Sequence, residues 1–154
     1  MISRDGRLLC AAAQRYGTLH RRAPADPRIV LRAQFGWAPN QFVEETIFDT
    51  GATYAILNAQ LAEALELLEA IGDETIRYST RAGQYTCQLH RVPVRLIASV
   101  GHDLDLVLPC LVTEYWSQPT FLGYYGLVDR LAFAVDPSDD TFHFGIAAEA
   151  PPSA

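Results

Sequence analysis

The chain has 154 residues, of which 49% are hydrophobic and 19% charged, with a formal net charge of −6 and a mean hydropathy of +0.04. This composition excludes a disordered chain, and no run of about 18 apolar residues suggests a membrane-spanning helix. The length suits one domain with a single core. The apolar run after Arg7 is only six residues, too short for an export signal. We therefore expect a cytoplasmic protein without a membrane partner.

The basic residues are concentrated at the start of the chain. Residues 1–32 hold seven of the twelve arginines and two acidic residues, whereas the remainder holds five arginines and sixteen acidic residues. These arginines are scattered, without interleaved aromatic residues, and the chain has no lysine, so nucleic acid is not an expected partner. The use of arginine alone hints at a GC-rich bacterial source. A basic segment can instead dock on the acidic remainder, fray, or act as an inhibitory pro-segment.

Three segments are expected from the turn residues and the composition. Pro24 and Pro27 break regular structure and predict a boundary near Arg28. The segments are a basic N-terminal arm at 1–27, a compact domain at 28–146 and a disordered tail at 147–154. Three cysteines, Cys10, Cys87 and Cys110, are widely spaced and form no metal-binding pattern, which predicts reduced thiols in or near the core.

Alternating apolar and polar residues between turn signals predict a mainly β domain. A hairpin with Gly83 near its tip is expected, and Pro109 suggests an edge or a bulge in its strand. The expected strands are, in chain order, 28–35, 43–50, the two arms of a hairpin within 74–98, 104–113, 131–135 and 141–145.

Two helices interrupt this pattern. The first is an amphipathic helix at about 58–71, with Asn58 as its N-cap and Gly72 as its C-terminal stop. The second is a short helix at about 124–130. The first helix carries a leucine stripe that we interpret as core packing, formed by Leu57, Leu61, Leu65 and Leu68.

The run IFDTGATYAIL at 47–57 places one carboxylate, Asp49, in an otherwise apolar segment. A buried carboxylate is costly unless it is paired or hydrogen-bonded. Asp-Thr-Gly is also good turn chemistry, so Asp49 alone is compatible with a turn-capping role. The remainder of the chain has to distinguish the two interpretations.

Two motifs in order resemble the retropepsin-like aspartic proteases. FDTGA at 48–52 resembles their active-site signature, and FLG at 121–123, followed by YYGLVDRLAFAVD, resembles their second signature. The resemblance covers about 28–146 and implies a retropepsin-like closed β-barrel with one added helix. Retroviral members usually carry Asp and Arg where this chain has Thr53 and Tyr124, which removes the viral pattern of ion pairs at the dimer interface.

The resemblance implies an aspartic endopeptidase. Such an enzyme needs two carboxylates close enough to share one proton: the ionised one activates water, and the protonated one donates to the carbonyl oxygen. The chain contains no second Asp-Thr-Gly or Asp-Ser-Gly, so a homodimer with one Asp49 from each subunit is expected. Its substrate is a peptide in extended conformation. No metal or organic cofactor is implied.

The resemblance also assigns roles to individual residues. The catalytic loop comprises Asp49, Thr50 and Gly51, with Thr50 bonded across the dimer. Ala52 contacts the substrate, together with a flap formed by the hairpin tip. Tyr78 or Tyr85 either lines the cleft or packs in the hairpin. The flap residues are Arg81, Ala82 and Gly83, and the residues expected to support the site are Phe48, Phe121, Leu122 and Gly123.

Two other classes of function stay open. A retropepsin-like domain can be a catalytically silent peptide-binding or dimerisation module. The stretch GHDLD gathers His102, Asp103 and Asp105, which would suit a metal hydrolase only if further ligands were added, and a solvated turn is the simpler interpretation. No cysteine lies in a recognisable nucleophile context.

Overall fold

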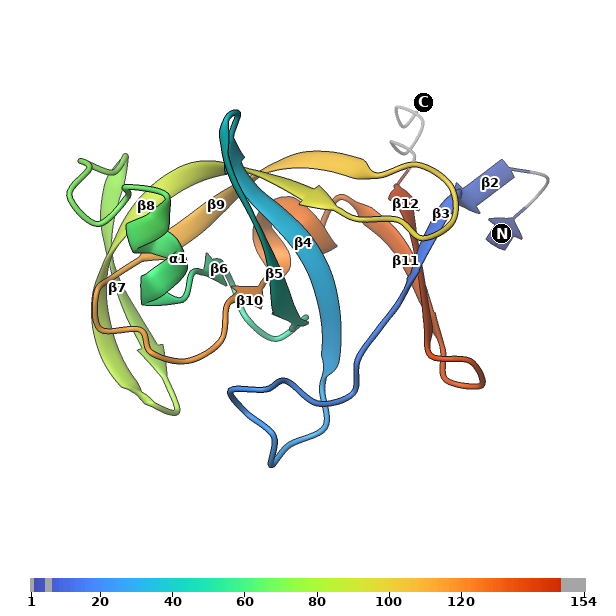
Figure 1. Ribbon diagram of the computed structural model, residues 1–154, viewed down its shortest axis with the longest axis horizontal. Coiled ribbons are helices and arrows are strands. Elements are labelled where there is room, and N and C mark those ends of the chain that lie inside the picture. The colour runs from blue at the N-terminus through green and yellow to red at the C-terminus, as the bar shows by residue number, and fades with distance from the viewer. Residues whose placement is uncertain (1, 5–6, 148–154) are drawn as a thin grey trace, which may run out of the picture.

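The computed structural model describes residues 2–4 and 7–147 and is mainly β, as predicted (Figure 1). One end of the molecule carries the only α-helix of the described residues and a long hairpin, and the other end carries a separate small sheet. The elements are β1 (Ile2–Arg4), β2 (Arg7–Cys10), β3 (Ala12–Arg15), β4 (Ile29–Trp37), β5 (Asn40–Phe48), β6 (Ala55–Ile56), α1 (Ala59–Ala64), β7 (Glu74–Thr80), β8 (Gly83–Leu96), β9 (Leu104–Val112), β10 (Phe121–Leu122), η1 (Tyr124–Val128), β11 (Leu131–Asp136) and β12 (Thr141–Ile146).

Six strands close into a barrel, which confirms the predicted fold class. They follow the order β4-β5-β10-β6-β9-β8, and β8 pairs back onto β4 through Ala33 opposite Leu96 and Phe35 opposite Val94. Closure removes the open edges that a flat sheet would leave. The alternating apolar positions predicted from the sequence point inward: Leu31, Ala33 and Phe35 on β4 are fully buried.

The predicted hairpins are present. β4 and β5 pair antiparallel along their full lengths, and β7 pairs with the first half of β8, with Gly83 at the tip. Pro109 lies in β9 one residue before the stretch that pairs with β6. On the side that faces β6, β9 is therefore unpaired at Pro109, as expected for a residue without an N–H.

The amphipathic helix is shorter than predicted. Asn58 caps it, accepting a hydrogen bond from the Gln60 N–H at 3.0 Å, but α1 ends at Ala64 rather than near Gly72. Glu66 adopts a left-handed conformation with φ of 60°, which stops the helix. The leucine stripe packs in the core as expected, since Leu57, Leu61 and Leu65 are buried.

The second predicted helix is also wrong in extent and regularity. η1 is a single wide turn over Tyr124–Val128, and Tyr125 and Gly126 have non-helical backbone angles within it. Gly126 has a φ of 81°, and a Cβ on it would lie 2.7 Å from Pro109 Cδ. The close packing of η1 on β9 therefore replaces the expected helix.

Part of the N-terminal arm pairs with the C-terminal strands. β3 pairs antiparallel with β12, so β11, β12 and β3 form one three-stranded sheet. Gln14 is buried and bonds both ways to the backbone of Arg32 on β4, at 2.8 and 3.2 Å. β3 therefore docks on the remainder of the fold, which was one of the alternatives left open for the basic segment. Of the predicted tail at 147–154, all but Ala147 lies outside the described residues.

The three cysteines are buried free thiols, as expected. Burial raises the pKa of Cys87 and, most strongly, that of the fully buried Cys110, so neither is a ready nucleophile. Within residues 2–4 and 7–147, no helix is long and apolar enough to cross a membrane.

Candidate active site

Asp49 is held at the end of β5. The last residues of β5 pair in parallel with β10, with Phe48 opposite Leu122. The Asp49 N–H then donates to the Leu122 carbonyl oxygen at 3.0 Å. Phe48 is buried and packs edge-on against Phe133 and Phe142, each at 5.0 Å between ring centroids. The end of a buried strand and an aromatic cluster thus fix the position of the Asp49 backbone.

The Asp-Thr-Gly segment folds back on its own carboxylate. The Gly51 N–H donates to Asp49 Oδ1 at 2.8 Å, and the Ala52 N–H approaches the Asp49 carbonyl oxygen at 3.3 Å. A Cβ at Gly51 would lie 3.2 Å from Asp49 Oδ1. Asp49 is half-buried, while Thr50 and Gly51 are exposed.

The second signature supports this loop from behind. Leu122 is fully buried in the barrel, and a Cβ on Gly123 would overlap the Tyr54 carbonyl oxygen and lie 2.8 Å from that of Ala52. The chain after Gly123 bonds to the same loop, because the Tyr124 N–H donates to the Ala52 oxygen at 2.7 Å. Only glycine allows so close an approach of the two backbones.

A cleft of about 740 Å³ opens in front of Asp49. Its floor includes Gly51 and Ala52, and its roof is the tip of the β7–β8 hairpin, where Arg81 and Ala82 line the space. The cleft thus brings the predicted catalytic loop and the predicted flap together. The predicted residues that do not line it are Thr50, Gly83, Phe48, Leu122 and Gly123.

Near its tip, the hairpin also contacts the segment that follows the catalytic loop. Tyr78 on β7 lines the cleft. Burial raises the pKa of its hydroxyl, a hydrogen bond with the Thr53 backbone lowers it, and the charge of Asp49 raises it further. Tyr78 therefore faces the catalytic loop, which answers the question left open for it. Tyr85 instead packs on Trp116 with 5.3 Å between ring centroids.

Sequence reasoning missed Trp116 and Arg28 in the cleft lining. Trp116 is 4% exposed, donates its indole N–H to the Pro119 oxygen at 2.9 Å, and stacks edge-on against Phe121. A tryptophan shortly before the second signature was a usable signal for a wall residue. Arg28 was interpreted as a domain boundary, and no local pattern in the sequence indicates that it lines the cleft.

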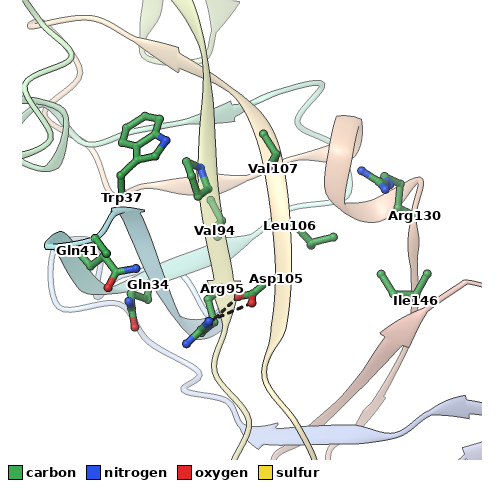
Figure 2. Close-up of a pocket in the computed structure, with 13 residues that line it drawn as sticks. Gln34, Trp37, Gln41, Val94, Arg95, Asp105, Leu106, Val107, Arg130 and Ile146 are labelled. Carbon is green, nitrogen blue, oxygen red and sulfur yellow. Dashed lines mark hydrogen bonds and ion pairs between the residues drawn. The ribbon is translucent and has the colours of Figure 1, made fainter.

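A second cavity of about 670 Å³ lies on the outer face of the barrel (Figure 2). Arg95 and Asp105 form a two-pronged ion pair in it, at 2.6 and 3.0 Å. The Arg95 guanidinium lowers the pKa of Asp105, and Asp105 raises that of Arg95. The carboxylate is therefore already engaged, and this cavity offers no reactive group comparable to Asp49.

The GHDLD stretch is not organised for a metal. Asp105 pairs with Arg95, and Asp103 accepts the Ala98 N–H at 2.8 Å. In the described part of the chain, no three side chains of the metal-ligating types gather in one place. The carboxylates of this stretch are used in local contacts, and only residues 101–103 lie between the strands, because Leu104 and Asp105 already belong to β9.

Comparison with known proteins gives a likeness in structure alone. No protein-family model and no curated protein sequence matches the chain. The fold is similar to that of a retropepsin-like aspartic protease from Rickettsia conorii, with a TM-score of 0.56 and 19% identity, over 85% of this chain and 97% of that one.

Two further solved structures are more distant. The retroviral protease-like domain of Ddi1 from Leishmania major has a TM-score of 0.47 and 16% identity, over 78% of this chain and 95% of that one. The simian foamy virus (mac) protease has a TM-score of 0.41 and 13% identity, over 63% of this chain and 89% of that one. With the Rickettsia likeness, the closed barrel defines a retropepsin-like fold.

Proposed function

We propose that the protein is an aspartic endopeptidase that acts as a homodimer. The observation that carries the proposal is the position of Asp49: a half-buried carboxylate, hydrogen-bonded by the following Gly51 amide, at the floor of a cleft roofed by a hairpin. Asp49 is the one carboxylate among the residues that line this cleft. Hydrolysis by this route needs a second carboxylate, which a two-fold related copy supplies.

In the proposed reaction, the two Asp49 side chains hold one proton between them. The ionised carboxylate takes a proton from water as the water oxygen bonds to the carbonyl carbon, and the protonated carboxylate donates to the carbonyl oxygen. The tetrahedral intermediate then loses its amine, which leaves with a proton returned by the pair. Because the two groups share the proton, they titrate as one unit.

The surroundings of Asp49 suit this chemistry. The loop is tied to β10 and to the chain after Gly123 by backbone hydrogen bonds, so little reorganisation is needed when charge develops. The exposed Thr50 is placed at the surface of the loop, where we propose that it bonds to its counterpart in the dimer. The hairpin tip can close over an extended peptide and bond to its backbone.

A silent peptide-binding or dimerisation module is the second candidate. The same cleft and hairpin favour it as much as they favour an enzyme. A binding module has no use for the half-buried carboxylate, however, because such a group weakens peptide binding unless it is paired. The retained Asp49 therefore favours catalysis.

Cleavage of a diverse peptide library, read by mass spectrometry from about pH 3 to 8, tests the proposal. Wild type and Asp49→Asn are compared, because the amide keeps the shape and cannot act as a base. We expect products from wild type alone, with a loss of at least about a thousandfold in the variant. Products that persist in Asp49→Asn would overturn the assignment, and no products from a folded, dimeric wild type would favour the binding module.

A further inference from the structure

The charges that line the candidate active-site cleft are unlike those of the whole molecule. The chain has a formal net charge of −6, yet two arginines, Arg28 and Arg81, line the cleft beside the single carboxylate Asp49. The other lining side chains are uncharged. Apart from the reacting group, the walls that meet a substrate are cationic.

The backbone of Arg28 is held by a hydrogen bond, whereas its side chain is available to a substrate. Its N–H donates to the Thr18 oxygen at 2.7 Å, immediately before β4 begins. Its guanidinium pairs only loosely with Asp26, at 3.9 Å, and the two side chains are 45% and 74% exposed. An ion pair this exposed holds its partners weakly, so a substrate carboxylate can replace Asp26.

Arg81 lines the cleft from the hairpin tip. Thr80 Oγ1 accepts the Ala82 N–H at 3.0 Å, and the Tyr85 hydroxyl donates to the Ala82 oxygen at 3.3 Å. These bonds shape the turn that presents Arg81 to the cleft. Among the described residues, none of the ion pairs involves Arg81.

The cleft also has an apolar wall. Ile56 and Phe121 line the cleft with Trp116, whose ring is held by its own hydrogen bond to Pro119. This wall is rigid and suited to an apolar or aromatic side chain. On an extended peptide, side chains on one face recur every two residues, roughly 7 Å apart, which places a charged neighbour within reach of an arginine.

We infer that the cleft selects acidic peptides: extended substrates with an apolar residue at the scissile bond and Asp or Glu within about three residues of it, recognised by Arg28 and Arg81. This inference rests on the proposed function. In a two-fold dimer each arginine occurs twice, so the preference applies on both sides of the scissile bond. Basic peptides are disfavoured by the same charges.

The test uses one apolar-centred peptide in which each flanking position carries Glu, Gln or Lys in turn. We expect kcat/KM to fall from Glu to Lys by roughly tenfold at the best position, since attraction is replaced by repulsion. The ratio should shrink as salt is raised, because the contacts are exposed.

The variants are Arg28→Gln and Arg81→Gln, and the matched control is Arg77→Gln. Arg77 lies on the same hairpin but is exposed and does not line the cleft. Each cleft variant should reduce the Glu-to-Lys ratio by about threefold to fivefold, whereas Arg77→Gln should keep it. Asp26→Asn should increase the ratio, because it removes the competing carboxylate at Arg28.

Binding of the same peptides to the Asp49→Asn protein, by fluorescence anisotropy, separates this inference from the proposed function. A Glu preference in binding without cleavage by wild type would support the charge selection and overturn the peptidase. Cleavage with equal rates for Glu and Lys peptides would support the peptidase and overturn the charge selection. A ratio that is unchanged in both cleft variants would also overturn the roles of the two arginines.

Discussion

At the scale of single residues, the protonation of the buried His90 makes the stability of the fold depend on pH. His90 is 8% exposed on β8, and among the described side chains its Nε2 is the buried polar atom without a hydrogen-bond partner. Burial lowers its pKa from 6.5, and the nearby charge of Asp73 opposes the shift only in part. The folded state therefore binds the His90 proton less readily than the unfolded chain does.

The sign of the resulting pH dependence follows. Above about pH 6.5 both states are neutral at His90, and below it the unfolded state takes up the proton first. We expect the free energy of unfolding to fall as the pH drops from 7.5 to 5, and this slope to be smaller in His90→Gln. Urea unfolding across that range measures it. Parallel curves for wild type and His90→Gln would contradict the prediction.

Other single residues show what sequence patterns can and cannot indicate. Gly123 was predicted to support the site from the FLG motif, and the structure gives the reason in the carbonyls of Tyr54 and Ala52. Arg28 and Trp116 line the cleft because distant segments meet there. Such positions depend on tertiary packing, so no local periodicity indicates them.

At the scale of elements, strands were predicted better than helices. Alternation is a strong signal when one face of a strand fills a closed barrel, as on β4 and β8. The apolar spacing after Leu65 is typical of a helix, but the left-handed backbone at Glu66 ends the helix. Leu68 then packs against the core from a non-helical segment. In η1, the close packing of Gly126 on Pro109 likewise determines the backbone conformation. Tertiary contacts here override the intrinsic helix propensity of the segment.

The N-terminal arm makes an element-scale prediction. A chain starting at Arg28 loses β3 from the edge of β12, together with the bonds of Gln14 to Arg32. We expect a lower free energy of unfolding in denaturant and slower cleavage. Gln14→Ala should itself cost about 2 kcal/mol, because it leaves the Arg32 N–H without its acceptor.

Arg15→Ala is the matched control, since Arg15 on the same strand is exposed and should change stability by no more than about 0.5 kcal/mol. The hypothesis of an inhibitory pro-segment predicts the opposite activity. Faster cleavage by the truncated chain than by the full chain would support the pro-segment and contradict a purely structural arm.

At the scale of the whole molecule, the proposed function makes the candidate site one half of a catalytic apparatus. One Asp49 carboxylate lines the cleft, and the exposed Thr50 and Gly51 place the loop where a second copy can reach it. Tyr124 and Tyr125 beside the loop are 46% and 47% exposed, so apolar surface is available for self-association next to the reacting group. Closed two-fold symmetry would then bring the two loops together.

Subunit mixing tests this arrangement more directly than molecular weight does. If each active site needs Asp49 from both subunits, wild type mixed with an equal amount of Asp49→Asn forms active dimers only in the wild-type pairs, about a quarter of the total after exchange. Cleavage should therefore fall to about half of that shown by the same amount of wild type alone, and a larger excess of the variant should approach complete inhibition. A monomeric enzyme would lose nothing on mixing. Co-purification of untagged wild type with an affinity-tagged Asp49→Asn protein shows whether exchange has taken place, so that unchanged activity in a fully mixed dimer would contradict the shared site.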